Sequence, residues 1–406
     1  MSGDQGLLKR INRMAIVRYV RARPGLARGE LAQLTGLADS TVSVLVKGLI
    51  EDGWLRAHAL AESRGAGRRP QVLSTDTTRL ALLGAEVGVD YIAVAACNIQ
   101  GDLLFSRVEN YRHEGVERSV RDMASIVAEA RARMVGEGRL PLGLGVGLPG
   151  MVELDGTLRL APNLGWRDVS MPPLITSALQ RLGCGDLPVF VLNDANAGAL
   201  SEHVFGASDA TQSMVFLSLG FGIGAGVILD SGLHLGRAGL AGEVGHSVAQ
   251  PDGLPCTCGR RGCFETLISQ RAISRSATGR EEPILSVEDL GVRVARGEPG
   301  AVAAVRAAGA HLGLMVHNLV VAIDPAVVVL GGPLSRLTLL VDTALDEVRR
   351  LAGDSPHHQA TIRTCRFGIH AGVCGAAASV LDHLLHPLDR GAGVREAGAR
   401  EGVTFS

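Results

Sequence analysis

The sequence predicts an N-terminal winged helix-turn-helix module, mainly α-helical with a β-wing, followed by a much larger α/β body. Three observations predict this division. Residues 1–75 carry 12 Lys and Arg against 6 Asp and Glu, whereas the rest of the chain carries 28 against 35. Short helical patterns separated by a glycine turn occupy the basic segment. Beyond residue 78, apolar strands that end in glycines or polar side chains alternate with helical segments, which is typical of an α/β body with a mainly parallel sheet.

The composition limits the class of protein. A chain of 406 residues with 46% hydrophobic residues and 53 glycines is too long for one compact core and is expected to contain many tight turns. No apolar run reaches the roughly 20 residues that a membrane helix needs, and the N-terminus lacks an apolar signal core. We therefore expect a cytoplasmic protein with no membrane partner. Residues 389–406 are rich in Gly, Arg and Glu and are expected to be disordered.

The basic segment contains the pattern of a DNA-binding helix pair. Apolar residues from Leu8 to Val20 recur at helical spacing and stop at Pro24. A short helix over 28–34 and a longer one over 39–52 flank the turn at Gly36, which is the helix-turn-helix arrangement. The side chains expected to point outward from the longer helix, into a DNA major groove, are Ser40, Thr41, Ser43, Val44 and Lys47.

Two features of this segment have competing interpretations. Asp39 would approach phosphates, so we interpret it as the cap of the longer helix, where a negative charge is favourable. A β-wing is expected after Gly53, followed by a Gly-Arg-Arg-Pro linker in which Arg68 and Arg69 reach the minor groove or phosphates. The alternatives are a solvated linker and a winged helix that contacts only proteins.

A cluster of metal-ligand residue types lies in the middle of the chain. His246, Cys256, Cys258 and Cys263 fall within 18 residues, and this spacing predicts a structural zinc site with a Cys3His ligand set. The alternative is free thiols that only pack in a core. Disulfides are disfavoured, because the chain has an odd count of seven cysteines and no secretion signal. The remaining cysteines are isolated in apolar runs and are expected in the core: Cys97, Cys184, Cys365 and Cys374.

Two carboxylates are interleaved with these ligands. Glu243 and Glu265 have no role in a purely structural metal site, so they indicate a polar pocket that the metal braces. Because carboxylates form paired hydrogen bonds with neighbouring hydroxyl groups, the expected ligand is a hydroxyl-rich small molecule.

The motifs together resemble those of the ROK family of repressors, open reading frames and sugar kinases, in its repressor branch. The resemblance rests on the glycine-rich run 219–226 continuing to Gly242, on the spacing of the zinc motif, and on the winged helix with its Gly-Arg-Arg-Pro segment. It covers nearly the whole chain. It implies a two-lobed, actin-like and ribonuclease-H-like body over 78–388 with a hinge near residue 194, and a homodimer or homotetramer.

The resemblance also implies a set of sugar contacts. These are Gly150, Asn163, Asn193, Asp194, Glu243, His246 and Glu265. His246 would ligate zinc through one ring nitrogen and meet a sugar hydroxyl with the other, so that the metal fixes its tautomer. The competing interpretations are a turn residue for Asn163 and a helix cap for Asn193 and Asp194.

The kinases of the family provide the second functional hypothesis. By resemblance Asp194 corresponds to their general base, which takes a proton from the sugar hydroxyl during phosphoryl transfer. Their phosphates lie on an Asp-x-Gly-Gly-Thr turn and a Gly-Thr-Gly turn, but this chain has Val89, Asp90 and Phe221 at three of those positions. A valine side chain obstructs close backbone approach, and an aspartate repels phosphate. We therefore expect ATP-dependent catalysis to be lost.

These observations lead to one preferred function and two alternatives. We expect a non-enzymatic regulator, a repressor of carbohydrate genes, that binds operator DNA and responds to a monosaccharide or sugar phosphate. The alternatives are an ATP-dependent sugar kinase that uses Asp194, and a regulator that binds a protein partner in place of a sugar.

Overall fold

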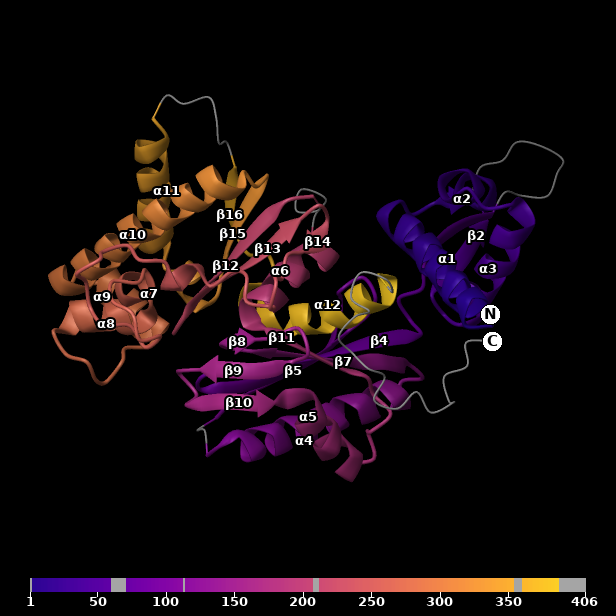
Figure 1. The fold of residues 1–406 in the computed structure, drawn as a ribbon, viewed down its shortest axis with the longest axis horizontal. Coiled ribbons are helices and arrows are strands. Elements are labelled where there is room, and N and C mark those ends of the chain that lie inside the picture. Colours follow the sequence, from indigo (N-terminus) through magenta and orange to yellow (C-terminus); the bar gives the residue numbers. More distant parts are fainter. Residues whose placement is uncertain (1, 60–70, 112–113, 207–211, 354–359, 387–406) are drawn as a thin grey trace.

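The computed structural model describes residues 2–59, 71–111, 114–206, 212–353 and 360–386. The N-terminal part, drawn in indigo in Figure 1, is a helix-turn-helix with a small antiparallel sheet in the order β1-β3-β2. Its elements are α1 (Ser2–Ala22), β1 (Leu26–Ala27), α2 (Arg28–Thr35), α3 (Asp39–Glu51), β2 (Leu55–Ala59) and β3 (Gln71–Thr75). The winged helix-turn-helix prediction is confirmed. Gly36 ends α2 with a φ of 68°, a conformation that favours glycine.

The Gly-Arg-Arg-Pro segment lies between two strands of the wing, not after the wing as the sequence predicted. Strands β2 and β3 pair from Leu55 with Thr75 to Ala59 with Gln71. The connection over 60–70 contains Arg68 and Arg69 and lies outside the described residues. Since its two flanking strands pair with each other, this connection joins two strands of the wing, and the four residues 76–79 connect β3 to the next strand of the chain, which begins at Leu80.

The first half of the body is built on one five-stranded sheet, with the order β11-β7-β4-β5-β6. Helices α4 and α5 contact it on one side, whereas α12 covers the other side with α6 beside it (Figure 1). A small sheet, β10-β9-β8, lies at its edge. The elements are β4 (Leu80–Val87), β5 (Tyr91–Cys97), β6 (Leu103–Asn110), α4 (Val116–Gly136), β7 (Leu140–Leu148), β8 (Met151–Val152), β9 (Thr157–Ala161), β10 (Trp166–Ser170), α5 (Met171–Arg181), β11 (Val189–Asn193), α6 (Asp194–Phe205) and α12 (Ala371–Leu385).

The second half repeats this plan, with a five-stranded sheet in the order β14-β13-β12-β15-β16. In both sheets the first strand in chain order is central, the second and third lie on one side, and the fourth and fifth lie on the other. The elements are β12 (Met214–Leu219), β13 (Ile223–Leu229), β14 (Gly232–Leu233), η2 (Val244–His246), α7 (Glu265–Ile268), α8 (Gln270–Thr278), α9 (Val287–Ala295), α10 (Pro299–Ile323), β15 (Val327–Gly331), η3 (Pro333–Arg336), α11 (Thr338–Ala352), β16 (Thr361–Thr364) and η4 (Gly368–His370).

The sheets are mixed, so the expectation of mainly parallel sheets is wrong. In each sheet the first, fourth and fifth strands are parallel, whereas the second and third are antiparallel to their neighbours. The reason is the length of the connections. Only the three residues 88–90 join β4 to β5, and only 220–222 join β12 to β13. Connections this short allow hairpins but not parallel crossovers.

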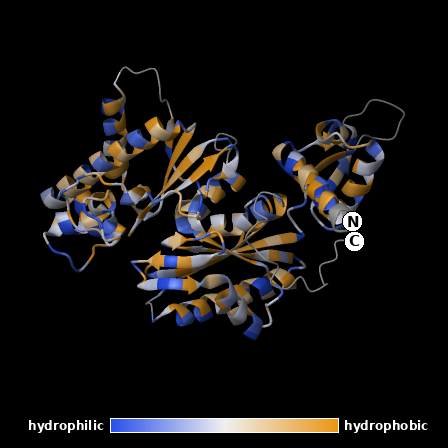
Figure 2. Cartoon of the chain, in the orientation of Figure 1, coloured by the Kyte–Doolittle hydropathy of each residue, from blue (hydrophilic) through white to orange (hydrophobic). Residues whose placement is uncertain are grey.

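The apolar residues concentrate on the strands of the body and on the helix faces that cover them (Figure 2). Two segments, Pro299–Ile323 and Gly368–Leu385, are long and apolar enough to span a membrane by length and composition, which the sequence analysis did not anticipate. The windows that meet this test are 50% and 67% buried, with α10 packed on α8 and α11, and α12 packed on α6 and the first sheet. Core packing accounts for their apolar character.

The isolated cysteines lie mostly where expected. Cys97, Cys184 and Cys374 are buried, whereas Cys365 is partly exposed. The Sγ atoms of Cys97 and Cys374 lie 3.9 Å apart between β5 and α12.

Candidate functional site

The predicted DNA-facing side chains lie on one exposed face of α3. Ser40, Thr41, Ser43, Val44 and Lys47 are all exposed, and Val44 is 68% exposed. The opposite face packs into the core of the module through Val42, Leu45, Val46 and Leu49. An exposed row of small and polar groups beside one branched apolar side chain has the chemistry of base-edge and thymine-methyl contacts.

The interpretation of Asp39 as a helix cap is wrong. Ala38 occupies the N-cap position of α3 and Asp39 lies in the first turn, without a side-chain hydrogen bond that caps the helix. Its exposed carboxylate still lies at the positive end of the helix dipole, where a negative charge is favourable.

Close backbone crossings form the segment that carries Glu243 and His246. The N–H of Ala225 in β13 donates to the carbonyl of Gly242 over 2.8 Å. Gly242 has a φ of 95°, and a Cβ there would lie 1.9 Å from the carbonyl oxygen of Ala225. Only glycine permits this approach. The turn places the short helix η2, with His246, directly against β13.

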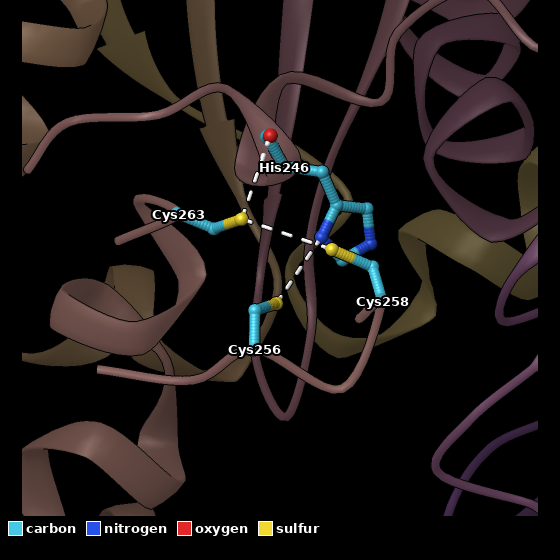
Figure 3. Close-up of side chains that lie close together, drawn as sticks. All are labelled: His246, Cys256, Cys258 and Cys263. Atoms are coloured by element: carbon cyan, nitrogen blue, oxygen red, sulfur yellow. Dashed lines mark hydrogen bonds between the residues drawn. The ribbon is translucent and has the colours of Figure 1, made fainter. Parts of the chain in front are cut away.

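The four predicted zinc ligands converge, as Figure 3 shows. One ligand atom from each of His246, Cys256, Cys258 and Cys263 lies within 4.8 Å of the others. The Nδ1 of His246 is 3.5 Å from the Sγ of Cys256, and the Sγ atoms of Cys258 and Cys263 are 3.7 Å apart. A tetrahedral zinc ion separates its ligands by about 3.6 Å for sulfur to nitrogen and about 3.8 Å for sulfur to sulfur. The donor set therefore fits zinc.

Hairpin geometry presents the three sulfurs. The N–H of Cys256 donates to the carbonyl of Arg260 over 2.8 Å, which closes a tight turn around Cys258. The pKa of Cys263 is raised to about 12, first by burial and then by the neighbouring thiols of Cys258 and Cys256. Three thiolates this close together repel one another and are stabilised by a bound cation, which agrees with the donor set of a metal site.

The predicted sugar contacts from the second half of the body gather beside this cluster. His246 turns its Nε2 toward Glu243, 3.8 Å from a carboxylate oxygen, while its Nδ1 faces the sulfurs. Glu265 accepts the backbone N–H of Ile223 over 3.1 Å. A Cβ on Gly222 would lie 3.2 Å from the same Glu265 oxygen and 3.7 Å from the side-chain nitrogen of Asn163, so the three residues are neighbours.

The contacts from the first half come from the end of β11 and the start of α6. Asn193 accepts backbone N–H groups of Ala195 and Asn196 as the N-cap of α6, and its amide nitrogen donates to the carbonyl of Gly150 over 2.8 Å. Those atoms of Asn193 are thus already engaged, which bears out its cap interpretation. The pKa of Asp194 is raised to about 6, chiefly because burial disfavours its charge.

The carboxylates of the two halves also influence one another electrostatically. The pKa of Glu243 is raised to about 7, first by burial and then by the negative charges of Asp194 and Glu265. Asp194 belongs to the first half of the body and the other two to the second. The structure therefore brings Asn163, Asp194, Glu243, His246 and Glu265 toward one region, with Gly150 behind Asn193.

Two residues that flank the turn between β4 and β5, Glu86 and Tyr91, were missed by sequence reasoning. Glu86 is buried, and the Tyr91 hydroxyl donates to it over 2.5 Å. The Tyr91 ring lies across Gly88, where a Cβ would meet ring carbons at 2.2 to 2.5 Å. The chain's own tyrosine thus covers the glycine turn between β4 and β5. The sequence shows that an aromatic residue follows Glu86 and Gly88 closely. No local pattern, however, predicts that its ring packs over the glycine.

The pKa of Glu86 is raised to about 7, chiefly by burial, with the hydrogen bond from Tyr91 lowering it and the charge of Asp194 raising it. The residues that the sequence analysis found altered lie around this turn and its counterpart. Val89 and Phe221 are half-buried, and Asp90 is exposed.

Comparison with known proteins places these features in a family. A model of the ROK family matches residues 82–383, and a model of the IclR helix-turn-helix domain matches residues 14–59. The xylose repressor of Caldicellulosiruptor bescii is 30% identical over 405 residues, which cover 94% of this chain and 98% of the relative. The glucokinase of Streptomyces coelicolor is 32% identical over 318 residues, covering 73% of this chain and 96% of the enzyme.

Solved structures give the same division. A ROK family transcriptional regulator described as a homologue of Escherichia coli Mlc superposes with a TM-score of 0.77 at 25% identity, over 93% of this chain and 98% of its own. A ROK glucokinase from Streptomyces griseus, in complex with glucose and AMPPNP, superposes with a TM-score of 0.63 at 29% identity, over 73% of this chain and 98% of its own. The xylose repressor and the ROK regulator match both the N-terminal module and the body, whereas the two glucokinases match a shorter part of the chain. Since the family model spans most of the chain and the body is two sheets of repeated order behind a helix-turn-helix, this protein belongs to the ROK family.

Proposed function

We propose that the protein is a transcriptional repressor that binds operator DNA through its N-terminal module and releases or strengthens that binding when a sugar occupies the body. The observation that carries this proposal is the extent of the likeness to xylose repressors, which includes the DNA-binding module as well as the body. The exposed polar face of α3 supports it, because none of the residues that the structure describes packs over that face.

The sugar is a monosaccharide or sugar phosphate held by the groups that face each other across the two halves. Asp194, Glu243 and Glu265 would accept hydrogen bonds from neighbouring hydroxyls, and Asn163 would donate or accept one. The Nε2 of His246 would meet a further hydroxyl. The names of the relatives make D-xylose the first candidate and D-glucose the second.

Zinc would hold this arrangement together. Its ligands are His246, Cys256, Cys258 and Cys263, and when bound it supplies structural rigidity and fixes the tautomer of the histidine. The residues of this chain then orient Glu243 and Glu265 from the two ends of the same braced segment. We propose no catalytic role for the metal.

The turn between β4 and β5, where the family's kinases hold the phosphates of the nucleotide, is unsuited to phosphoryl transfer in this chain. Tyr91 covers the turn where the family's kinases would hold phosphate, and Asp90 adds an exposed negative charge. The alternative of an ATP-dependent sugar kinase is favoured by one observation: Asp194, at the start of α6, has a pKa raised to about 6, within reach of a general base at neutral pH.

Sugar binding would act on DNA affinity through the relative position of two modules in a homodimer or homotetramer. Dimeric readers need half-sites about one helical turn apart, so a small rotation of the modules weakens binding. The sugar shifts this balance only by its different affinity for the two states.

The test uses the full-length protein. Operators are enriched from random DNA, and calorimetry screens D-xylose, D-glucose and their phosphates; one of them should bind and change operator affinity. A coupled assay with ATP and the same sugars should show no turnover. A rate above about 1 s⁻¹ would favour the kinase, and a protein that no sugar affects would favour the regulator with a protein partner.

The DNA contacts are tested separately. Replacing both Arg68 and Arg69 by Ala should weaken operator binding and lower the salt slope by up to about 2, because each phosphate contact contributes about 0.9. An unchanged slope would argue against contacts from this segment. Val44→Ser should instead weaken only operators that carry a particular thymine, by a few-fold to about a hundredfold.

A further inference from the structure

Helix α6 connects the candidate sugar site to a distant part of the molecule. It begins at Asp194 and ends at Phe205, a length of about 18 Å at 1.5 Å per residue. Its middle is packed without spare room. A Cβ on Gly198 would meet the ring of Phe216 at 2.2 Å, and a Cβ on Gly375 of α12 would meet the carbonyl oxygen of Ala197 at 1.6 Å. Because such contacts do not yield gradually, a displacement of one end of α6 is carried to the other.

The last turn of α6 is attached to the second sheet. Glu202 is fully buried, and one of its carboxylate oxygens accepts the backbone N–H of Arg366 over 2.7 Å. The other oxygen lies 2.8 Å from a guanidinium nitrogen of Arg363 in the edge strand β16. A buried carboxylate requires such partners, so this end of the helix follows the second sheet.

The same turn touches the first half of the body and the DNA-binding module. The Phe205 ring packs on Gly101, where a Cβ would meet it at 2.4 Å. The guanidinium carbon of Arg21 in α1 lies 6.0 Å from the centroid of that ring, at the outer limit for a cation–π contact. Arg21 also feels the charge of Asp382 in α12, and α12 contacts α1 directly. Figure 1 shows the end of α12 beside α1.

Helix α1 is in turn connected to the DNA-reading helix. Arg13 forms an ion pair with Asp52, the residue that follows α3. Gly48 of α3 leaves room for the Arg13 side chain, since a Cβ there would lie 2.9 Å from its guanidinium group. Contacts therefore run without a gap from the site at Asp194 through α6 and α1 to α3.

We propose that the last turn of α6, with Glu202 and Phe205, is the element that couples the sugar site to the DNA-binding module, and that Arg21 is the positioning residue on the module's side. The proposal rests on the proposed function, because it assigns the route by which the sugar changes DNA affinity. In the sugar-bound state a shift of the second sheet moves Glu202, and with it the Phe205 ring that Arg21 of α1 faces.

A second physical connection competes with this one. Arg79, at the start of the body, donates to the carbonyls of Ile50 and Glu51 at the end of α3, over 3.3 and 2.8 Å. It sits in the short junction 76–79. Signals that travelled through this junction would need Arg79 and would not need Arg21.

The experiment measures operator affinity by fluorescence anisotropy with and without saturating D-xylose, in the full-length protein and its variants. The response factor is the ratio of the two dissociation constants, and coupling in the usual range makes it about 5 to 150. Arg21→Ala and Phe205→Leu should each lower the response factor at least about threefold, and the double variant no further, because both remove one contact. Calorimetric xylose affinity without DNA should stay within about twofold of wild type.

Three further variants distinguish a loss of coupling from a simple loss of charge and from a loss of folding. Arg23→Ala removes the same charge from the end of α1 at an exposed position and should retain the wild-type response factor. Arg21→Lys keeps the cation and should restore part of the response. Glu202→Gln keeps the shape of the buried side chain but not its charge, and should also lower the factor.

Two results would overturn the coupling route alone. One is a wild-type response factor in both Arg21→Ala and Phe205→Leu. The other is its loss only in Arg79→Ala, which would assign the route to the 76–79 junction. A wild-type protein that binds operator but responds to none of D-xylose, D-glucose and their phosphates would overturn the proposed function, and the coupling with it.

Discussion

The two turns that join the first and second strands of each sheet occupy equivalent places in the repeated fold, yet they are built differently. The turn between β4 and β5 is covered by the ring of Tyr91, whose hydroxyl donates to the buried Glu86. The turn between β12 and β13 is lined at Gly222 by Glu265 and Asn163, two of the candidate sugar contacts. The repeated topology therefore provides two equivalent turns. A tyrosine ring covers the first turn, and polar side chains line the second.

We propose that this difference separates sugar recognition from phosphoryl transfer in this chain. Phosphoryl transfer needs a held triphosphate as well as a held sugar. Recognition of a sugar needs only the second. A chain that covers the first turn with its own tyrosine can retain the sugar-facing groups intact, together with the zinc-ligand cluster beside them.

The largest expected effect tests the metal side of the comparison. Cys258→Ser should remove the metal and lower the melting temperature strongly, because structural zinc contributes on the order of 10 kcal/mol to small sites. Elemental analysis and thermal unfolding measure both. Cys365→Ser, a partly exposed cysteine outside the cluster, is the matched control and should keep one zinc per chain. Full zinc content in Cys258→Ser would contradict the assigned ligand set.

The second effect tests whether the sugar-facing groups act without the nucleotide turn. Asp194→Asn should lower sugar affinity at least about a hundredfold, because a donor replaces one acceptor oxygen and leaves a hydroxyl unpaired. Operator affinity without sugar should stay unchanged. Titration calorimetry and anisotropy give the two values, with Asp186→Asn at an exposed position as the control. Undiminished induction in Asp194→Asn would remove this residue from the site.

The third effect tests whether Glu86, beside the covered turn between β4 and β5, is buried with a raised pKa. The folded-state pKa of Glu86 is raised from 4.5 to about 7 by burial. A raised carboxyl pKa contributes stability that is complete below pH 4.5 and is lost as the pH rises through about 7. Glu86→Gln keeps an acceptor for Tyr91 without the charge, so it should gain stability relative to wild type over this window, by up to about 3 kcal/mol.

Denaturant unfolding at pH 5 and pH 8 measures this gain. Glu109→Gln, a partly exposed carboxylate in β6 that pairs with Arg107, is the control and should show no such trend. A constant difference between Glu86→Gln and wild type at both pH values would mean that Glu86 is ionised throughout.

The smallest effect tests whether Tyr91 is the obstacle to nucleotide. Val89→Gly with Asp90→Thr brings the turn closer to the loop of the family's kinases but leaves the Tyr91 ring on Gly88. We expect no ADP binding in the double variant, and weak binding, near millimolar or about −4 kcal/mol, when Tyr91→Ser is added. Calorimetry with magnesium and ADP distinguishes them. Tight ADP binding by the double variant would show that the ring does not close the turn.

Local patterns in the sequence predicted much of this protein. The helix-turn-helix, the exposed face of α3 and the four candidate zinc ligands follow from spacing over short segments, the longest of them Arg28–Glu51, where one helix face or one hairpin brings side chains together. Gly242 was part of a recognisable motif, and its close approach to Ala225 of β13 explains why a glycine stands there.

Other features depended on contacts that no local pattern contains. Arg21 meets Phe205 and Glu202 meets Arg363 across more than 150 residues of chain. The direction of the second and third strands, and the hydrogen bond from Asn193 to the carbonyl of Gly150, also came only from the folded molecule. The sequence by itself determined which chemical groups exist and which neighbours share a helix or a hairpin. The tertiary structure decided which distant groups meet, because burial and close packing act on the whole chain at once and select one partner from many that composition allows.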